Sequence, residues 1–530
     1  MRNFEQPGRS VAIATHGMAA TSHPQATLTA LDVLRSGGNA MDAAIAACAV
    51  QCVVEPGSTG IGGDCFALLA KRGGSDVVAF NGSGRAPMAA TTDWYTSRGI
   101  VRIERQTPHA VTVPGAVDAW CRLTADHGTR DLGELLAPAI KLAREGYAIT
   151  PRVHYDWAEQ VAMLKADPTA RRMLLVNDLA PAIGTRHRQP ELAQTLAAIG
   201  QGGRKAFYEG PVAEDMVGLL RQHGGLHTLE DFVMAAGEYV TPIRTRFRGA
   251  DVYECPPNGQ GLIALLLMNI LGGFEPADGP TSLSRIHREI EAARLAYAVR
   301  NTVLGDPAQT AIAVGDLLSA PFAASLRDLI KPGQLAVVPA AYAAAAHNDT
   351  VYICVVDEDR NCVSFINSVF GTFGSGLVAP KSGVVLHNRG SSFLLDPGHP
   401  NAIAPGKRPM HTIIPGMLMR DGRAEMPFGV MGGHYQALGQ AVFLESVLGH
   451  GLDLQEAMQL PRYFPRPGTS IVEYESTLPA ATAQGLHDLG YTLERPTRPI
   501  GGAQAIRIDW QEGVLIGASD PRKDGCALGY

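Results

Sequence analysis

The feature that most constrains this chain is a predicted β-hairpin deep inside the sequence, opened by Thr350. Residues 351–356 (VYICVV) are β-branched, aromatic or small and apolar, which predicts a buried strand. A polar turn follows at 357–361, and residues 362–367 (CVSFIN) resume the strand pattern. The sequence therefore places Thr350 at the start of a buried strand.

Thr350 gains a chemical role if the peptide bond before it is cut. The residue would then carry a hydroxyl nucleophile together with a free α-amine that can act as its base. On the hairpin alone, an ordinary strand-opening threonine is the simpler interpretation. Evidence from the rest of the chain is needed to distinguish a nucleophilic threonine from an ordinary one.

Short motifs spread from one end of the chain to the other bear on this choice. They are 17–22 (GMAATS), 34–44 (LRSGGNAMDAA), 60–64 (GIGGD), 114–115 (PG), 256–261 (PPNGQG), 373–376 (FGSG), 407–409 (KRP), 431–433 (MGG) and 517–522 (GASDPR). In this order and over this span, the sequence resembles the γ-glutamyltransferase (glutathione hydrolase) family of N-terminal-nucleophile hydrolases.

The resemblance implies self-cleavage of the Asp349–Thr350 bond, with Thr350 as the mature nucleophile. Residues 1–349 would form the large (α) subunit, and residues 350–530 would form the small (β) subunit. The implied fold is of the α+β class, a four-layer αββα sandwich, with one domain made from the two autocleaved fragments. Each fragment would be the partner of the other in a heterodimer, and a higher oligomer is left open.

Local patterns predict the elements of such a fold. Before Thr350, apolar periodicity and the positions of Gly and Pro predict helices within 24–54 with a break at Gly37-Gly38, near 133–146, 190–200 and 212–223, and over 281–303. They predict strands at 65–70 and 76–81 and extended chain at 240–255. After Thr350, they predict strands up to about 433 and helices near 435–449 and 454–460.

Composition excludes several classes of protein. The 530 residues carry a formal charge of -6, so the chain lacks the excess of positive charge with which proteins bind nucleic acid. No run of about 18 apolar residues predicts a membrane span, and residues 1–8 lack the apolar core of a secretion signal, which predicts a cytoplasmic location. Eight scattered cysteines without a CxxC pair are typical of reduced thiols in the core.

Two motifs invite other interpretations. Residues 60–64 (GIGGD) would suit a dinucleotide-dependent oxidoreductase only with a strand before them and a helix after them. Here a helix is predicted before and a strand after, so a tight turn is expected. Residues 357–359 (DED) lack the spacing of a calcium loop, and no HExxH or zinc-type cluster is present. We expect no metal and no organic cofactor.

The resemblance assigns two further parts of the catalytic machinery. The oxyanion hole of the family falls on Gly432 and Gly433, and successive glycines let backbone N–H groups approach an oxyanion closely. Ser368 matches a family threonine that hydrogen-bonds the nucleophile, and serine keeps the hydroxyl group.

Three positions match residues that hold the substrate α-carboxylate in the family. Arg85 matches the family arginine, and a guanidinium suits a carboxylate bidentately. His411 and Thr412 stand where the family has paired serines, and both can still donate hydrogen bonds.

The chain departs from the family where the glutamyl α-amino group binds. The family uses Asn, Gln and Asp, whereas this chain has Phe370, Arg389 and Ser392. The change removes the counter-ion of an ammonium and adds a like charge. The loop 394–406 is short compared with lidded family members, which predicts an open site.

These residues predict a pocket that recognises a carboxylate without an amine. The chain therefore looks most like the oxamate-amidohydrolase branch: a self-processing hydrolase of small carboxylate-bearing amides. An ordinary γ-glutamyltransferase acting on glutathione is the alternative, and an acylase of β-lactams or other amides is the third. A degenerate homologue that only binds ligands is the non-enzymatic alternative.

Overall fold

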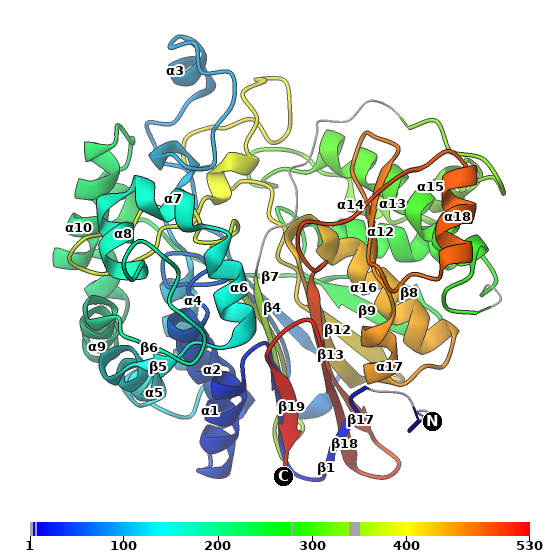
Figure 1. Cartoon of the computed structure of the whole chain (residues 1–530), viewed down its shortest axis with the longest axis horizontal. Coiled ribbons are helices and arrows are strands. Elements are labelled where there is room, and N and C mark those ends of the chain that lie inside the picture. Colours follow the sequence, from blue (N-terminus) through cyan, green and yellow to red (C-terminus); the bar gives the residue numbers. More distant parts are fainter. Residues whose placement is uncertain (1–3, 6–7, 277–278, 339–349) are drawn as a thin grey trace.

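Two seven-stranded β-sheets form the centre of the molecule (Figure 1). The computed structural model describes residues 4–5, 8–276, 279–338 and 350–530. The sheet that carries the predicted hairpin has the order β19 (Cys526–Gly529), β2 (Met18–Thr21), β10 (Val351–Val356), β11 (Cys362–Ser368), β3 (Asp64–Ala70), β4 (Val77–Gly82) and β7 (Glu238–Val240). The facing sheet has the order β1 (Ala12–Ala14), β18 (Val514–Ser519), β17 (Gly502–Asp509), β13 (Arg423–Met431), β12 (Gly416–Arg420), β9 (Ala250–Glu254) and β8 (Ile243–Phe247).

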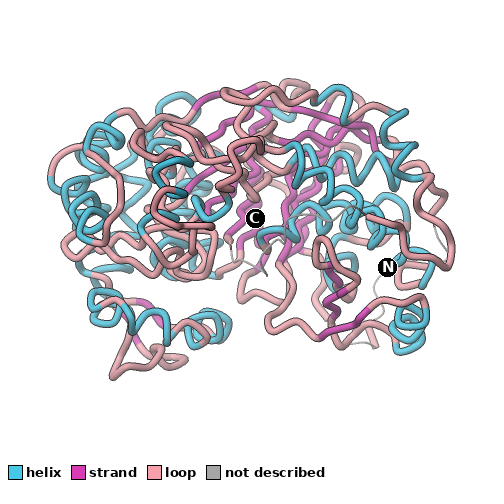
Figure 2. Tube along the Cα trace, turned by 90° about the horizontal axis from the view of Figure 1, so that it is seen from above, coloured by secondary structure: helices cyan, strands magenta, loops and turns pink. Residues whose placement is uncertain are grey.

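Helices cover the outer faces of both sheets, as Figure 1 and the view from above in Figure 2 show. On the hairpin's side lie α1 (Pro24–Arg35), α2 (Ala40–Val54), α4 (Ala116–His127), α5 (Leu132–Glu145), α6 (Pro151–Ala158), α7 (Val161–Ala166), α8 (Pro168–Leu174), α9 (Pro190–Tyr208), α10 (Pro211–Gln222) and α11 (Leu229–Val233). On the other side lie α12 (Gly261–Leu271), α13 (Leu283–Val303), α15 (Ala320–Arg327), α16 (Gln436–Leu444) and α17 (Leu454–Gln459).

Smaller elements complete the described chain. They are α3 (Thr92–Thr96), α14 (Val314–Leu317), α18 (Ala480–Asp488), the pair β5 (Tyr147–Ala148) with β6 (Arg186–His187), and the three-stranded sheet of β14 (Tyr463–Pro465), β15 (Ile471–Tyr474) and β16 (Thr492–Glu494).

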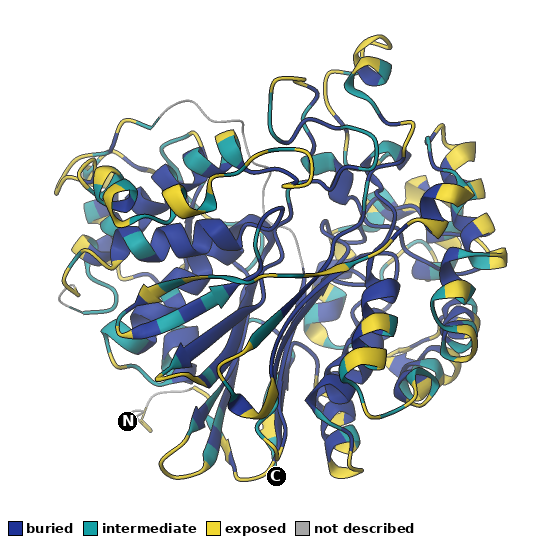
Figure 3. Cartoon of the chain, turned by 180° about the vertical axis from the view of Figure 1, so that it is seen from behind, coloured by how far each residue is buried: buried dark blue, intermediate teal, exposed yellow. Residues whose placement is uncertain are grey.

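Three hydrophobic cores separate four layers. Along β10, Ile353 and Val355 face the first helical layer, whereas Tyr352 and Cys354 face the second sheet. Side chains of β13 such as Phe428 face the second helical layer. Because neighbouring strand residues point to opposite faces, each sheet contributes to two cores. Figure 3 shows the result, with buried strands in the centre and exposed residues on the outer helices. The αββα sandwich is confirmed.

The predicted hairpin and most predicted helices are confirmed. β10 and β11 pair antiparallel, with Val351 opposite Asn367 and Val356 opposite Cys362. Asn39 caps α2 through a capping box, as its position after the glycine pair indicates. The helix predicted near 435–449 is α16 followed by a π-helix at Glu445–Gly449. The helix predicted near 190–200 continues to Tyr208 across a kink at Gly203.

Both sheets contain strands from before and after Thr350. In the first sheet, β10 lies between β2 and β11, and β11 lies between β10 and β3. The two predicted fragments therefore share their hydrogen-bonded sheets as well as their cores.

Two further predictions concern the cysteines and membrane-spanning helices. All eight cysteines are free. Among the described residues, no helix combines the length and the apolar character that a membrane crossing needs.

Candidate active site

Thr350 lies immediately before β10, in register with the last residue of β11. Its Oγ1 is 3.1 Å from the Oγ of Ser368, and both side chains are buried. The pairing follows from the hairpin register, because Val351 stands opposite Asn367. Asp349, the other residue of the predicted cleavage bond, lies outside the described residues. The structure thus joins the predicted nucleophile to its predicted hydroxyl partner.

Phe370 occupies a strained turn just after β11. Its φ of 73° lies in the left-handed region, which is uncommon for an aromatic residue. The backbone N–H of Phe370 donates a hydrogen bond of 2.9 Å to the Ser368 hydroxyl, which holds the turn in place. Backbone strain of this kind costs on the order of 1–3 kcal/mol and clusters at functional sites.

Arg389 packs on the Phe370 ring. Its guanidinium carbon lies 3.8 Å from the ring centroid, and its Nη1 donates to Thr412 Oγ1 at 2.9 Å. The side chain is fully buried, and its Nε and Nη2 have no hydrogen-bond partner in the described part of the chain. Burial lowers the pKa of Arg389 to about 9, opposed by Asp64 and reinforced by Arg105.

Gln260 links Thr412 to the predicted oxyanion hole. Its Nε2 donates to the carbonyl of Thr412 at 2.8 Å and to that of Gly433 at 3.0 Å. Its Oε1 accepts from Nη1 of buried Arg300 at 3.0 Å. One side chain therefore fixes two backbone segments that both carry predicted site residues.

The backbone at the end of β13 requires glycine. Gly432 and Gly433 have φ values of 118° and 58°, which L side chains rarely adopt. Three residues earlier, a Cβ on Gly429 would lie 2.3 Å from the Tyr352 ring, so the missing side chain lets β13 approach β10 closely. This close approach carries the glycine pair toward the strand that Thr350 opens.

Asp64 is a buried carboxylate at the start of β3. It accepts from Nε2 of His411 at 2.9 Å and lies 3.5 Å from Nδ1 of His387. Its other oxygen accepts from the backbone N–H groups of Gly84 and Gly115. Burial acts to raise its pKa, but the two histidines and Arg389 lower it to about 2. An ionised Asp64 therefore favours the charged form of Arg389.

The remaining predicted residues have other surroundings. Arg85 is one-third exposed, donates to the Gly406 carbonyl at 3.1 Å and lies 3.7 Å from Asp306. His411 is engaged on both ring nitrogens, since Nδ1 accepts from the Ile413 N–H while Nε2 contacts Asp64. Ser392 ends the turn that begins at Arg389, and its Oγ is buried without a hydrogen-bond partner among the described residues.

The sequence interpretation gave no role to several residues that support the site. Asp64 ends the motif at 60–64 and Gln260 lies within the motif at 256–261, so the family-like motifs could have drawn attention to both residues. Arg300 and Arg105 carried no such signal, because one belongs to a helix and the other to a loop with no local pattern. Arg300 is fully buried and also contacts His434 Nδ1 at 3.0 Å.

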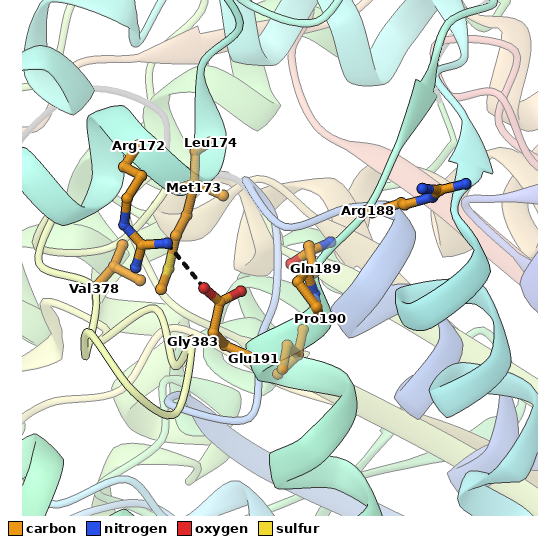
Figure 4. Close-up of a pocket in the computed structure, with 10 residues that line it drawn as sticks. Arg172, Met173, Leu174, Arg188, Gln189, Pro190, Glu191, Val378 and Gly383 are labelled. Carbon is orange, nitrogen blue, oxygen red and sulfur yellow. Dashed lines mark hydrogen bonds and ion pairs between the residues drawn. The ribbon is translucent and has the colours of Figure 1, made fainter.

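A separate pocket of about 180 Å³ lies between α8 and the start of α9 (Figure 4). None of the predicted site residues lines it. Its Arg172 points toward Glu191 and pairs with it at 2.9 Å, so that cation is already compensated. This pocket is therefore separate from the predicted site around Thr350.

The residues around Thr350 suit acyl transfer. A hydroxyl nucleophile, a hydroxyl partner, a glycine turn and a buried cation are connected through Ser368, Phe370, Thr412 and Gln260. Among the described residues, no group of three or more His, Cys, Asp or Glu side chains is arranged to hold a metal ion. The dinucleotide motif at 60–64 lies between α2 and β3, so it is a turn.

Comparisons with known proteins agree on one family. The sequence profile of the family described as Gamma-glutamyltranspeptidase matches residues 26–530. The chain is 35% identical over 525 residues to the Glutathione hydrolase-like YwrD proenzyme of Bacillus subtilis, covering 98% of this chain and 99% of that protein. It is 34% identical over 532 residues to the Oxamate amidohydrolase proenzyme of Klebsiella pneumoniae, with the same coverage.

A solved structure extends the agreement to three dimensions. The cephalosporin acylase from Bacillus halodurans superposes with a TM-score of 0.92 at 37% identity, covering 100% of this chain and 99% of that one. Fold and sequence thus agree, and the chain is an enzyme that belongs to the gamma-glutamyltranspeptidase family of N-terminal-nucleophile amide hydrolases.

Proposed function

We propose that this enzyme processes itself at the Asp349–Thr350 bond and then hydrolyses small carboxylate-bearing amides of the oxamate type. Oxamate places a carboxylate next to a primary amide and has no amine. The oxamate amidohydrolase among the relatives supports this substrate class.

The observation that carries the proposal is the environment of Arg389. A buried guanidinium with unfilled donors at Nε and Nη2 favours a carboxylate ligand and disfavours an ammonium. Thr412 and Phe370 fix its orientation from two sides. A glutamyl amine bound at this position would need an anion as its counter-ion, and Ser392 does not supply one.

The proposed processing reaction is an N→O acyl shift. The Thr350 hydroxyl attacks the carbonyl of Asp349, the C–N bond breaks, and water hydrolyses the resulting ester. The products are a new carboxyl end and the free α-amine of Thr350. That amine then accepts the hydroxyl proton in each turnover.

Hydrolysis of the substrate repeats this chemistry. Thr350 Oγ1 bonds to the amide carbon, and the backbone at Gly432 and Gly433 stabilises the oxyanion. The C–N bond breaks as the leaving nitrogen takes the proton from the α-amine, releasing ammonia. Water then attacks the ester and releases the acid, while the proton returns to Thr350. Arg389 orients the carboxylate.

A β-lactam acylase is the second candidate, because the cephalosporin acylase structure is similar over its full length. A glutathione hydrolase is the third, and the relatives named for glutathione support it. Both candidates differ from the first in the size of the acyl group that must fit beside Phe370.

The deciding experiment compares substrates on one purified preparation. Ammonia release from oxamate, colour from a γ-glutamyl anilide and loss of glutathione give three kcat/KM values. We expect oxamate to have the highest. Efficient turnover of glutathione with no reaction of oxamate would overturn the proposal in favour of a glutathione hydrolase.

A further inference from the structure

Arg300 is a fully buried cation next to the predicted oxyanion turn, which consists of Gly432, Gly433 and His434. Its Nη1 donates to Gln260 Oε1 and to His434 Nδ1, each at 3.0 Å. Because a guanidinium can only donate, Nδ1 of His434 carries no proton and this imidazole is neutral. Arg300 therefore contacts the turn directly and, through Gln260, a second time.

The charge of Arg300 has no counter-ion in the described part of the chain. Two other arginines of α13 are paired, Arg285 with Glu289 at 2.9 Å and Arg294 with Glu291 at 2.7 Å. Arg300 forms no such pair among the described residues, and its Nη2 has no hydrogen-bond partner there. Burial lowers its pKa to about 10, which leaves it charged at neutral pH. A buried charge without a counter-ion is unfavourable for folding, so stability alone does not account for it.

Three hydrogen bonds hold the oxyanion turn against α13 and Gln260. Tyr297, one helical turn before Arg300, donates from its hydroxyl to the His434 carbonyl at 2.6 Å. Gln260 Nε2 donates to the Gly433 carbonyl at 3.0 Å, and the contact of Arg300 with the His434 ring is the third. Arg300 is thus bonded to two side chains that both adjoin Gly433.

The reaction places a negative charge at this turn only transiently. When Thr350 Oγ1 bonds to the amide carbon, an electron pair of the C=O bond moves to the oxygen, and it returns when the C–N bond breaks. The hydroxyl proton passes to the α-amine of Thr350 and then to the leaving nitrogen. A fixed charge in a buried site acts strongly on such an anion, because neither water nor a counter-ion screens it.

We propose that Arg300 is the positioning residue of the oxyanion hole: it holds the Gly433 turn through Gln260 and His434, and its unpaired charge favours the anionic intermediate over the neutral amide. The inference rests on the proposed function for the nucleophile and the oxyanion turn, but it does not depend on which amide is the substrate. An interaction that is strong only in the intermediate raises kcat and leaves KM nearly unchanged.

The first test removes the charge. Arg300→Gln should lower kcat about tenfold or more and leave KM within about threefold. The substrate is the amide for which the unmutated enzyme has the highest kcat/KM. Arg288→Gln is the matched control, since Arg288 also lies on α13 and also donates to a neutral group, the Glu275 carbonyl at 3.1 Å. An unchanged kcat in Arg300→Gln would overturn the inference.

The second test separates the charge from the packing of the side chain. Arg300→Lys keeps a cation, but a buried ammonium loses its proton far more readily than a guanidinium. The ratio of kcat in Arg300→Lys to kcat in Arg300→Gln should therefore exceed one near pH 6 and fall toward one near pH 9. Tyr297 and His434, the titratable side chains that contact Arg300 in the described chain, are present in both variants. A ratio of one at every pH would assign Arg300 to structure alone.

The remaining outcomes are also decisive. If Arg300→Gln does not mature, Arg300→Lys is compared with the unmutated enzyme, and a kcat ratio that does not change with pH would overturn the inference. If oxamate is inert while γ-glutamyl amides react, the proposed substrate class is wrong, and the same variants test Arg300 on a γ-glutamyl amide. If oxamate is the best substrate and the variants lower only the midpoint of thermal unfolding, the proposed function stands and the role of Arg300 is wrong.

Discussion

The hydroxyl oxygens of Thr350 and Ser368 lie 3.1 Å apart across the first rung of a buried hairpin. Ser368 also accepts the N–H of Phe370, so one hydroxyl contacts both the predicted nucleophile and the turn that carries Phe370. The predicted nucleophile and one predicted specificity residue are therefore held at the same strand end.

Thr350→Ala should abolish both processing and amide hydrolysis, because one hydroxyl serves both reactions. A denaturing gel should show the unmutated chain as fragments 1–349 and 350–530 and the variant as one band. Thr350→Ser, which keeps a hydroxyl, should still be cut. A variant without the hydroxyl that matured at this bond and turned over amides would refute the nucleophile assignment.

Ser368→Ala should lower kcat by about tenfold or more. The change leaves the buried Phe370 N–H without its acceptor, which costs about 1–3 kcal/mol, and frees the Thr350 side chain to rotate. Ser368→Thr keeps the hydroxyl and is the matched control. Steady-state kinetics on processed protein is the measurement, and equal kcat in all three proteins would assign Ser368 to packing alone.

Gly433→Val should reduce turnover by a factor on the order of 10²–10³, the usual effect of losing one oxyanion donor. Its φ of 58° makes a β-branched residue unfavourable there. Gly422→Val is the control, since Gly422 has a φ of 75° with open space around it in the β12–β13 turn. If both variants fold and both keep full activity, Gly433 is only a structural turn.

Arg389→Gln combined with Ser392→Asp should shift the preference from oxamate toward γ-glutamyl amides. The pair removes a buried cation and adds an anion where an ammonium would bind. The ratio of kcat/KM values for the two substrates, measured against each single variant, reports the shift. A double variant with the original preference would show that specificity is set elsewhere.

Stability should fall as the pH drops from about 6.5 to about 4. Burial lowers the pKa values of His23, His187 and His227 from 6.5 to about 4. In this window the unfolded chain binds more protons than the folded one, so protonation favours unfolding. Each such histidine contributes about 1.4 kcal/mol per pH unit at full slope.

Denaturant unfolding at several pH values measures this effect. His227→Gln should reduce the slope, and the exposed His487→Gln serves as the control. A free energy of unfolding that is constant or rises toward pH 4 would contradict the prediction.

Local pattern predicted the hairpin, and the family resemblance predicted that Ser368 contacts Thr350. The observed register explains this contact, because strand pairing fixes cross-strand neighbours. The glycine pair after β13 was recognisable because few other residues adopt its backbone conformation.

Other features depend on loops that follow no period. The contact of Arg389 with Phe370 joins two turns, and Arg105 reaches the same ring from a third segment. The contacts of Arg85 with Gly406 and Asp306 likewise join distant segments. Such contacts are set by the tertiary fold, so residue type alone does not indicate them.

The position of β10 between β2 and β11 has a consequence for the cleaved enzyme. Once the bond before Thr350 is cut, neither fragment can leave without breaking a central sheet, so dissociation and unfolding become the same event. The precursor refolds as one chain in a first-order process. The two mature fragments would have to associate in order to refold, so the yield of active enzyme recovered from denaturant would depend on protein concentration. Self-cleavage as proposed would thus make folding of this enzyme a step that is performed once, before maturation.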